Sequence, residues 1–408
     1  MIVDNGQLPV GWEVKCIGDV CKTGAGGTPL KSKKEYYECG LIPWLLSGEV
    51  AQGEIFQSEN FITQTGLENS SAKIFPVNTV LVAMYGATAG QVGILRFEAA
   101  TNQAVCGILP NKKFIPEFIY YALLSKKEEL ISKAAGNAQP NISQIKIKNT
   151  EIPVPPLADQ KRIVAILDEA FEGCDRAIRN TENNLANARE LFESYLNVIF
   201  TQKGDGWDEK TLQEISLDFG RGKSKHRPRN DPKLYGESYP FIQTGDVRNC
   251  NHVITECSQY YSEVGLAQSK LWRKGTICIT IAANIAETGI LGFDACFPDS
   301  IIGIQVNPNL TSNEFVEYLL QAVKARIKAK GQGSAQDNIN MGTFENEKFS
   351  FPNLEQQRSI VDNLNQLSSE TYRLETIYRQ KLAALKELKQ SILQKAFTGE
   401  LTTDKEVA

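Results

Sequence analysis

Few residues of this 408-residue chain have the type and spacing that a catalytic site requires. Gly222-Lys223-Ser224 matches the end of a phosphate-binding loop, but Leu217 stands where that loop needs its first glycine. Asp218-Phe219-Gly220 matches the metal-binding motif of kinases, yet no catalytic loop accompanies it. Pro155-Pro156 lacks the polar residue before it and the aromatic residue after it that adenine methyltransferases use. We therefore expect neither a nucleotide site nor a methyl-transfer site.

Histidine and cysteine, the usual ligands of zinc, are also poorly placed. The chain has only two histidines, His226 and His252, and its nine cysteines include no C-x-x-C pair. This composition argues against a structural zinc site and leaves little scope for an imidazole general base. The cysteines are expected to be reduced thiols of a cytoplasmic protein. The sequence thus predicts a non-catalytic chain without a metal or cofactor of its own.

Five basic residues between Arg221 and Arg229 could bind a polyanion. The positions are Arg221, Lys223, Lys225, Arg227 and Arg229, and no acidic residue stands among them. The whole chain has 44 basic and 48 acidic residues and a formal net charge of −4. Affinity for the nucleic-acid backbone comes largely from Lys and Arg that neutralise phosphates. If the chain binds DNA, its basic residues must act locally or a partner must supply more.

The elements that hold these residues are arranged as a tandem repeat. An offset of 196 aligns residues 93–108 with 289–304, with seven identities in sixteen positions. An offset of 197 aligns Pro155, Gln160 and Ile163 with Pro352, Gln357 and Ile360. The period is far longer than the units of a solenoid, so it indicates two whole domains. Two similar domains suit a target that itself has two halves.

Each repeat begins with a globular part rich in short apolar runs and turn residues. Residues 80–84, 91–97 and 105–109 are typical of strands, as are residues 277–281, 289–293 and 301–306. Helical stretches at 117–134 and 314–330 interrupt these strands. The sequence therefore predicts an α+β fold for both globular parts.

A long helix follows each globular part. In the first, apolar or small residues recur at alternating spacings of four and three: Leu167, Phe171, Cys174, Ile178, Thr181, Leu185, Ala188, Phe192, Tyr195 and Ile199. The second continues this pattern: Leu364, Leu367, Thr371, Leu374, Tyr378, Leu382, Leu385, Leu388 and Ile392. We expect the two helices, each roughly 60 Å long, to pack as an antiparallel coiled coil. The alternative is that each helix packs only on its own domain.

These patterns give the expected domain boundaries: residues 1–155 for the first domain, 156–203 for the first helix, 204–352 for the second domain, 353–400 for the second helix and 401–408 for the tail. The longest apolar runs have the length of strands and are well short of the roughly 20 residues that a membrane span needs. The first ten residues lack the basic and apolar regions of a signal peptide. A soluble cytoplasmic protein is therefore expected.

Together these motifs resemble the specificity subunits of type I restriction-modification systems. The resemblance is carried by residues 8–13 (LPVGWE), 26–29 (GGTP), 42–49 (IPWLLSGE), 85–90 (YGATAG), 139–143 (QPNIS), 152–164 and 393–401 (LQKAFTGEL). It covers almost the whole chain. In the second repeat, residues 284–288 replace the loop at 86–90, and residues 333–340 only partly match 136–143. This divergence indicates that the two domains recognise different DNA sequences.

The resemblance implies a non-catalytic subunit with two tandem α+β target-recognition domains that each recognise one half of a bipartite double-stranded DNA target. The two helices would set the gap between the halves and dock two methyltransferase subunits. Restriction subunits with motor and nuclease activity would join for cleavage. S-adenosylmethionine, ATP and Mg²⁺ would then be used by the partner subunits, not by this chain.

Within that family, the candidates for DNA contact are polar or basic residues in the loops, because such side chains reach base edges and phosphates. In the first domain they are Lys31, Lys33, Lys34, Ser47, Tyr85, Thr88, Gln139 and Asn141. In the second they are Arg221, Lys223, Lys225, Arg227, Arg229, Thr244, Arg248, Gln336 and Asn338. The lysines could instead form a solvated face, and Asn141 and Asn338 could be turn residues that bond only the backbone.

Two other classes of protein remain as alternatives. A structural adaptor would use the coiled coil to tether proteins and would show no dependence on DNA. A fused methyltransferase would need the cofactor and adenine-pocket motifs that the chain lacks.

Overall fold

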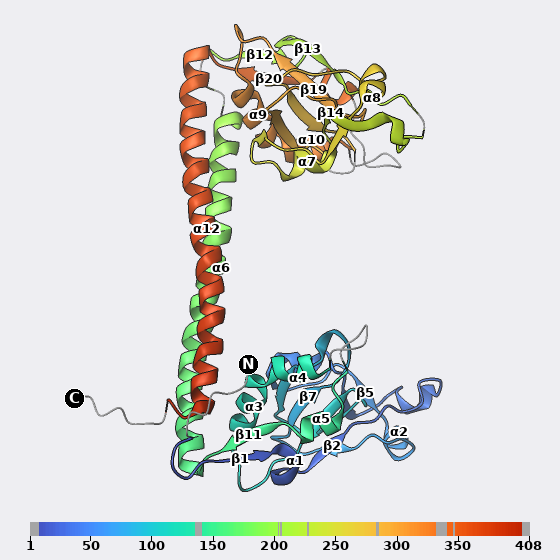
Figure 1. The fold of residues 1–408 in the computed structure, drawn as a ribbon, viewed down its shortest axis with the longest axis vertical. Helices are drawn as coiled ribbons and strands as arrows, with labels where there is room; N and C mark the ends of the chain where they lie inside the picture. The colour runs from blue at the N-terminus through green and yellow to red at the C-terminus, as the bar shows by residue number, and fades with distance from the viewer. Residues whose placement is uncertain are drawn as a thin grey trace, which may run out of the picture. The chain divides into compact units, whose positions relative to one another are not determined.

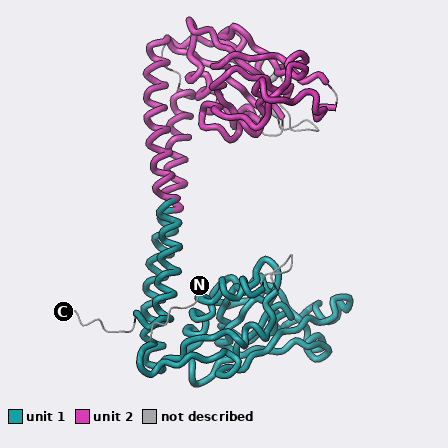
Figure 2. Tube along the Cα trace, viewed as in Figure 1, with its two compact units in different colours: residues 1–181, 380–408 teal, residues 182–379 magenta. Residues whose placement is uncertain are grey.

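The computed structural model describes residues 8–134, 141–202, 204, 206–226, 228–282, 285–331, 341–345 and 347–401. The chain forms two compact units (Figure 2). Unit 1 comprises residues 1–181 and 380–408, and unit 2 comprises residues 182–379. Each unit therefore contains one globular part together with a segment of both long helices (Figure 1).

The globular part of unit 1 contains three sheets and five short α-helices among its described residues. Its strands are β1 (Glu13–Cys16), β2 (Thr23–Ala25), β3 (Ile42–Leu45), β4 (Glu54–Ile55), β5 (Phe61–Ile62), β6 (Ile74–Phe75), β7 (Val80–Ala83), β8 (Val92–Leu95), β9 (Ala99–Thr101), β10 (Val105–Ile108) and β11 (Glu151–Val154). Its helices are α1 (Ile17–Val20), α2 (Gln64–Glu68), α3 (Pro116–Ser125), α4 (Lys127–Lys133) and α5 (Gln144–Lys148), with 3₁₀ turns η1 (Lys34–Tyr36), η2 (Glu49–Gln52) and η3 (Gly86–Thr88).

The globular part of unit 2 has a similar order of elements with fewer strands among its described residues. Its strands are β12 (Asp208–Thr211), β13 (Ser216–Arg221), β14 (Tyr235–Phe241), β15 (Val253–Ile254), β16 (Gln259–Tyr261), β17 (Ile277–Thr280), β18 (Thr288–Leu291), β19 (Ile301–Val306) and β20 (Lys348–Phe351). Its helices are α7 (Thr244–Asn249), α8 (Glu263–Ala267), α9 (Asn313–Ala322), α10 (Lys324–Gly331) and α11 (Met341–Glu345), with the 3₁₀ turn η4 (Pro232–Leu234). The long helices are α6 (Leu157–Thr201) and α12 (Leu354–Thr398).

The main sheets of the two units have the same topology. Unit 1 has the strand order β2-β10-β7-β8-β4, and unit 2 has the order β13-β19-β17-β18-β15. In both, the last strand pairs in parallel with its neighbour and the other pairs are antiparallel. A two-stranded sheet, β1-β11 or β12-β20, closes each globular part. The predicted α+β fold and the predicted duplication are confirmed by this arrangement.

Both faces of the main sheet are buried, because alternate residues of a strand point to opposite faces. In β7, Val80 and Val82 face a core that contains Phe118 of α3. Leu81 and Ala83 face a second core that contains Phe75. The strand β17 behaves in the same way, with Ile277 and Ile279 in one core and Cys278 in another. This double burial explains why these strands are continuous apolar runs in the sequence.

Local signals explain where the long helices begin and end. Pro155 and Pro156 precede α6, where proline can start a helix but cannot continue one. The side chain of Asn353 caps α12 by accepting a hydrogen bond of 2.9 Å from the backbone N–H of Gln356. After α12, Gly399 has φ +86°, the left-handed conformation that commonly ends a helix.

The two helices pack against each other in antiparallel directions in each unit. In unit 1, Lys389 of α12 binds the carboxylate of Asp175 of α6 at 2.6 Å, and its ammonium group lies 4.5 Å from the ring centroid of Phe171. In unit 2, Arg189 of α6 binds Glu375 of α12 at 3.0 Å. Later residues of α6 therefore contact earlier residues of α12. The antiparallel packing predicted from the heptad pattern is confirmed.

The apolar positions predicted to lie between the helices are only partly buried. Tyr195 and Leu388 are 39% and 47% exposed, whereas Leu196 is buried, and Leu374 is also exposed. Glu375 and Lys389 take the inward positions next to the expected leucines. Each of them forms an ion pair with the facing helix. A pattern of apolar residues cannot predict such charged contacts.

The loop after β7 and the corresponding loop after β17 differ in sequence but share one backbone hydrogen bond and one residue with positive φ. In unit 1, Gly90 has φ +80° and its N–H donates to the carbonyl of Ala83 at 2.8 Å. In unit 2, Ala286 has φ +59° and its N–H donates to the carbonyl of Thr280, also at 2.8 Å. The second loop is one residue shorter, so the offset is 197 between Ala83 and Thr280 and 196 between Gly90 and Ala286.

Candidate nucleic-acid interface

The basic loop of unit 2, residues 221–229, starts at the end of β13. The amide oxygen of Gln268 accepts hydrogen bonds from the backbone N–H groups of Lys225 at 2.6 Å and His226 at 3.1 Å. Ser269 donates to the backbone carbonyl of Lys223 at 2.8 Å. These bonds hold the backbone at Lys223, Lys225 and His226, while the side chains of the two lysines are exposed to solvent. Two lysines on a fixed loop are suited to contact phosphates.

Acidic residues from elsewhere in the sequence lie beside this loop. The guanidinium of Arg229 binds the carboxylate of Asp299 at 2.8 Å, and Arg221 donates to the backbone carbonyl of Asp299 at 2.8 Å. His226 lies 2.9 Å from Asp231. A hydrogen bond from the backbone N–H of Lys233, and then the contact with His226, lower the pKa of Asp231. The sequence has no acidic residue among the cluster, but the fold brings Asp299 next to it, where it contacts Arg221 and Arg229.

Thr244 and Arg248 both lie on the short helix α7. The carboxylate of Asp246 accepts a hydrogen bond of 2.7 Å from the backbone N–H of Gln243, which closes a capping box at the start of this helix. In unit 1, the corresponding carboxylate of Glu49 accepts from the backbone N–H of Leu46 at 2.7 Å. Ser47 therefore sits in a turn that is fixed in the same way as the start of α7.

Three of the candidates in unit 1 lie together. Tyr85 and Asn141 form an isolated antiparallel bridge, and the hydroxyl of Thr88 donates to the carbonyl of Tyr85 at 3.4 Å. The side chain of Lys146 joins them, because its ammonium group lies 3.5 Å from the carbonyl oxygen of Asn141. Lys146 was not among the residues predicted to contact DNA, although it follows the motif at 139–143 by only three residues.

The three lysines at 31–34 occupy an exposed segment that ends in the 3₁₀ turn η1. Lys33 lies 5.1 Å from the ring centroid of Tyr36 and 3.7 Å from the carboxylate of Glu35. The contact with Tyr36 and the charge of Glu35 raise the pKa of Lys33. In the part of unit 1 that the structure describes, no hydrogen bond joins Lys31, Lys33 or Lys34 to the group around Tyr85.

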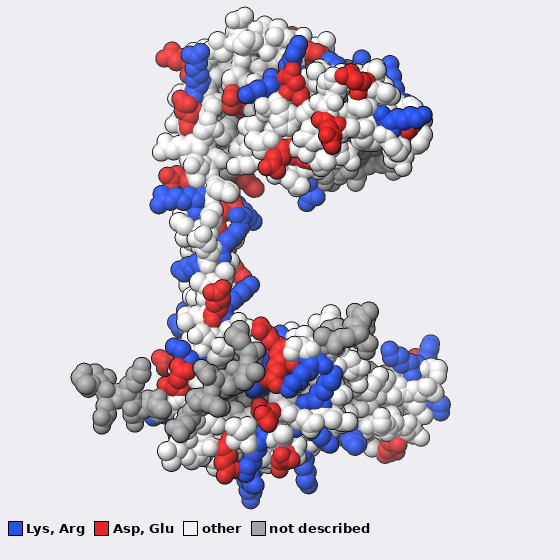
Figure 3. All heavy atoms as spheres, in the orientation of Figure 1, with Lys and Arg blue, Asp and Glu red and all other residues white. Residues whose placement is uncertain are grey.

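The remaining candidates, Gln139, Arg227, Gln336 and Asn338, lie outside the described residues. On the face of each unit shown in Figure 3, basic and acidic side chains are interspersed. Neither unit shows a continuous basic surface there, in keeping with the net charge of −4. The candidates thus form separate local groups.

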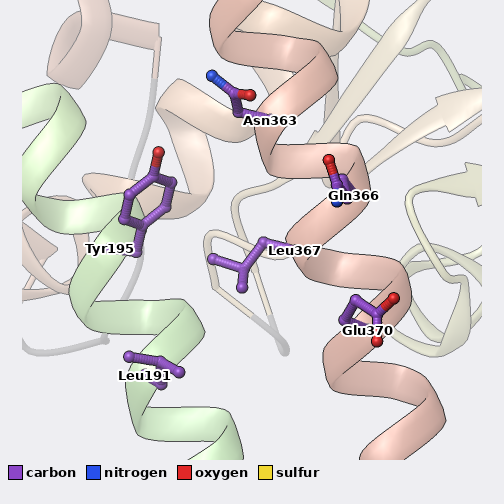
Figure 4. A pocket seen from close by; sticks show the side chains of 6 residues that line it. All are labelled: Leu191, Tyr195, Asn363, Gln366, Leu367 and Glu370. Carbon is purple, nitrogen blue, oxygen red and sulfur yellow. The ribbon is translucent and has the colours of Figure 1, made fainter.

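A groove between the two helices lies in unit 2. It is lined by Leu191, Tyr195, Asn363, Gln366, Leu367 and Glu370. Figure 4 shows Leu191 and Tyr195 on α6 opposite Leu367 on α12. Leu191 is 62% exposed. Large apolar side chains that face solvent on a helix pair are typical of a surface that binds another protein.

The described residues offer neither a metal site nor a membrane-spanning helix. Within the described ranges, no three His, Cys, Asp or Glu side chains gather in a way that could hold a metal ion. None of the helices in those ranges is long and apolar enough to cross a membrane.

Comparison with known proteins identifies the family. The family model for the type I restriction modification DNA specificity domain matches twice, at residues 9–187 and 204–386. The chain belongs to the type I specificity subunits. It determines the DNA target of a type I restriction-modification complex, and it is a non-catalytic subunit of that complex.

Several relatives of this specificity subunit align with almost its whole length. The MjaIX specificity subunit of Methanocaldococcus jannaschii is 24% identical, over 98% of this chain and 96% of the relative. The EcoKI specificity subunit of Escherichia coli K12 is also 24% identical, over 97% and 90%.

Solved structures show the same fold. A chain from a study of the assembly of a type I restriction-modification system aligns with a TM-score of 0.81 at 22% identity and covers 97% of the specificity subunit and 99% of that chain. The HsdS subunit from Thermoanaerobacter tengcongensis aligns with a TM-score of 0.61 at 22% identity, covering 96% and 98%.

Proposed function

We propose that the two globular domains of this specificity subunit each recognise one half of a bipartite DNA target, and that the long helices set the gap between the halves. The observation that carries the proposal is the duplication of the same sheet topology, β2-β10-β7-β8-β4 and β13-β19-β17-β18-β15, in one chain. The boundaries expected from the sequence, 1–155, 156–203, 204–352, 353–400 and 401–408, remain our division of the chain into domains, helices and tail.

The two domains would recognise different sequences because their candidate side chains differ. Unit 1 offers the group around Tyr85, Thr88 and Asn141. Unit 2 offers the basic loop and the polar residues of α7. Hydroxyl and amide groups bond the edges of bases, whereas the lysines of the basic loop are better suited to phosphates. The other candidates predicted from the sequence also remain proposed DNA contacts: Lys31, Lys33, Lys34, Ser47, Gln139, Gln336 and Asn338.

The helix pair is the proposed site for two methyltransferase subunits. The groove between Leu191, Tyr195 and Leu367 supports this, because apolar side chains that are exposed in the free chain are covered in a complex. Restriction subunits would join the same complex. S-adenosylmethionine, ATP and Mg²⁺ would be bound by these partners, and the complex would act on chromosomal DNA in the cytoplasm.

Reconstitution tests the proposal. The chain and a methyltransferase subunit are combined with S-adenosylmethionine and DNA that contains random sequence, and the methylated positions are mapped by sequencing. We expect two short specified sequences separated by a fixed unspecified gap, with one methylated adenine in each. A single contiguous motif would contradict the proposal. The chain alone should methylate nothing, and a methylated product in that control would indicate an enzyme instead of a recognition subunit.

A further inference from the structure

The joint between each globular domain and the helix that follows it is built around a buried glutamine. In unit 1, the amide nitrogen of Gln160 donates to the carbonyls of Lys113 at 3.1 Å and Pro155 at 3.0 Å, and its oxygen accepts from the N–H of Ile115 at 3.0 Å. Gln160 lies in the first turn of α6 and is only 1% exposed. One side chain thus ties the start of the helix to the segment before α3.

Unit 2 contains the same joint 197 residues later. Gln357 donates to the carbonyls of Leu310 at 3.0 Å and Pro352 at 2.9 Å, and it is also 1% exposed. Its oxygen accepts from the hydroxyl of Thr311 at 2.9 Å. The amide group of each glutamine therefore makes three hydrogen bonds, and only the donor to its oxygen differs between the repeats. A buried amide with this many partners has a single favourable orientation.

A tyrosine gives each joint a second point of attachment, eight residues further along the helix. The hydroxyl of Tyr121 donates to the carboxylate of Asp168 at 2.7 Å, and the hydroxyl of Tyr318 donates to the side chain of Asn365 at 2.8 Å. Burial, followed by the hydrogen bond to Asp168, raises the pKa of Tyr121, and burial raises the pKa of Tyr318 to about 12. Both phenols therefore remain protonated donors at neutral pH.

A third contact comes from the end of the other long helix. Phe397 of α12 packs on Phe118 with ring centroids 5.3 Å apart, and Phe200 of α6 packs on Phe315, also at 5.3 Å. Each domain is thus attached to its helices at three points. Two lie on the helix that follows the domain, and the third lies at the end of the other helix. Such an attachment constrains the tilt of the domain as well as its position.

We propose that Gln160 and Gln357, supported by Tyr121 and Tyr318, are positioning residues that fix the permitted gap between the two DNA half-sites. The inference rests on the proposed spacer function. A helix of 45 residues is about 68 Å long, so a tilt of about 3° at one end displaces the other by about 3.5 Å, which is close to the rise of one base pair. Loosening the joint should therefore relax the choice of gap without changing the sequence recognised by either domain.

The test measures binding of the reconstituted complex to duplexes that carry its target with the native gap or with one base pair more or less. We expect the wild-type complex to prefer the native gap by about tenfold or more. In the double variant Gln160→Met, Gln357→Met, which keeps the side-chain volume and removes the hydrogen bonds, the preference should fall to about threefold or less. A mutation in either half-site should weaken binding as much as it does for the wild-type complex.

Two further variants keep the test independent of folding. Tyr318→Phe removes one hydroxyl from a ring that stays packed, and it should reduce the gap preference in a chain that folds normally. Ile254→Val, in the core on the other face of the unit 2 sheet, which contains none of the joint residues, should lower the melting temperature and leave the gap preference intact. Joint variants that lose thermal stability yet keep the wild-type preference would overturn the inference. A wild-type complex that binds all gaps equally would overturn the spacer proposal itself, and the joint with it.

Discussion

At the residue scale, the arginines and the lysines of the basic loop of unit 2 have different surroundings. Arg229 and Arg221 both engage Asp299, whereas Lys223 and Lys225 extend from a backbone that Gln268 and Ser269 hold in place. The sequence predicted the clustering of these cations. It could not predict their pairing, because Asp299 lies 70 residues beyond Arg229 and meets it only after the sheet has formed.

The lysines of this loop are predicted to contact phosphates. The double variant Lys223→Ala, Lys225→Ala should weaken DNA binding by the complex for every sequence, and it should reduce the slope of log affinity against log salt by about 1 per lysine. Fluorescence anisotropy at several salt concentrations measures both quantities. The matched control Lys210→Ala, Lys348→Ala removes the same charge from the β12-β20 sheet and should leave the slope unchanged. An altered target sequence would contradict the assignment, since phosphate contacts do not specify bases.

Asp299 should oppose the binding of DNA at the same loop. Asp299→Asn removes the negative charge and keeps the backbone carbonyl that Arg221 uses, so we expect nonspecific affinity to rise by about twofold to fivefold at low salt. The increase should disappear at high salt because exposed charges are screened. Asp208→Asn, on β12, is the control with the same change of charge. Equal or weaker binding by Asp299→Asn would place the DNA elsewhere.

At the element scale, most of the fold could be predicted from the sequence. The strands of the main sheets are continuous apolar runs because both of their faces are buried, and this pattern is strong. The β5-β3-β9-β6 sheet was not predicted, because two of its strands have only two residues. The contact residues of the helix pair were predicted only in part, since Glu375 and Lys389 replace the apolar residues that the pattern favoured.

The ion pair between Arg189 and Glu375 should stabilise the helix pair of unit 2. The hydrogen bond from Arg189 lowers the pKa of Glu375, whose side chain is 16% exposed. A lowered pKa stabilises the folded state above the unfolded pKa of about 4.3, and this stabilisation is lost as the pH falls through the folded value. Glu375→Gln should reduce the free energy of unfolding by about 1 kcal/mol at pH 7, and the difference from wild type should vanish at an acidic pH at which Glu375 is protonated in the folded state as well.

Urea unfolding at both pH values measures this effect. Glu370→Gln is the control on the same helix, because Glu370 is more exposed and its partner Arg373 is 3.9 Å away. It should change the free energy of unfolding by less than about 0.5 kcal/mol. Because Glu375 also pairs with Arg379 of its own helix, a Glu375→Gln variant that matches this control at pH 7 would show that neither pair of Glu375 contributes measurably.

The long helices are predicted to act as a spacer. Repeating residues 175–181 after Thr181 and residues 373–379 after Arg379 adds seven residues to each helix and preserves the heptad. The added length of about 10.5 Å corresponds to about three base pairs. Methylation mapping should show a gap longer by about that amount with both half-sites unchanged. Insertion into α6 alone should abolish specific binding, and an unchanged gap in the double insertion would contradict the spacer role.

At the scale of the whole molecule, the duplication was the strongest signal in the sequence. It predicted two domains and two helices, and the family match at residues 9–187 and 204–386 follows the same division. The positions that contact DNA could not be predicted with the same precision. Tyr85 and Asn141, for example, are 56 residues apart in the sequence, and they become neighbours only when the chain folds.

The central claim is that this chain selects the DNA sequence on which a type I complex acts. Adenine methylation should be compared across the host genome before and after deletion of the gene for this chain. We predict the loss of methylation at one bipartite motif on both strands, with all other methylated motifs unchanged, and its return when the gene is restored. The claim would be contradicted if a host with active methyltransferase subunits showed the same genome methylation with and without this chain.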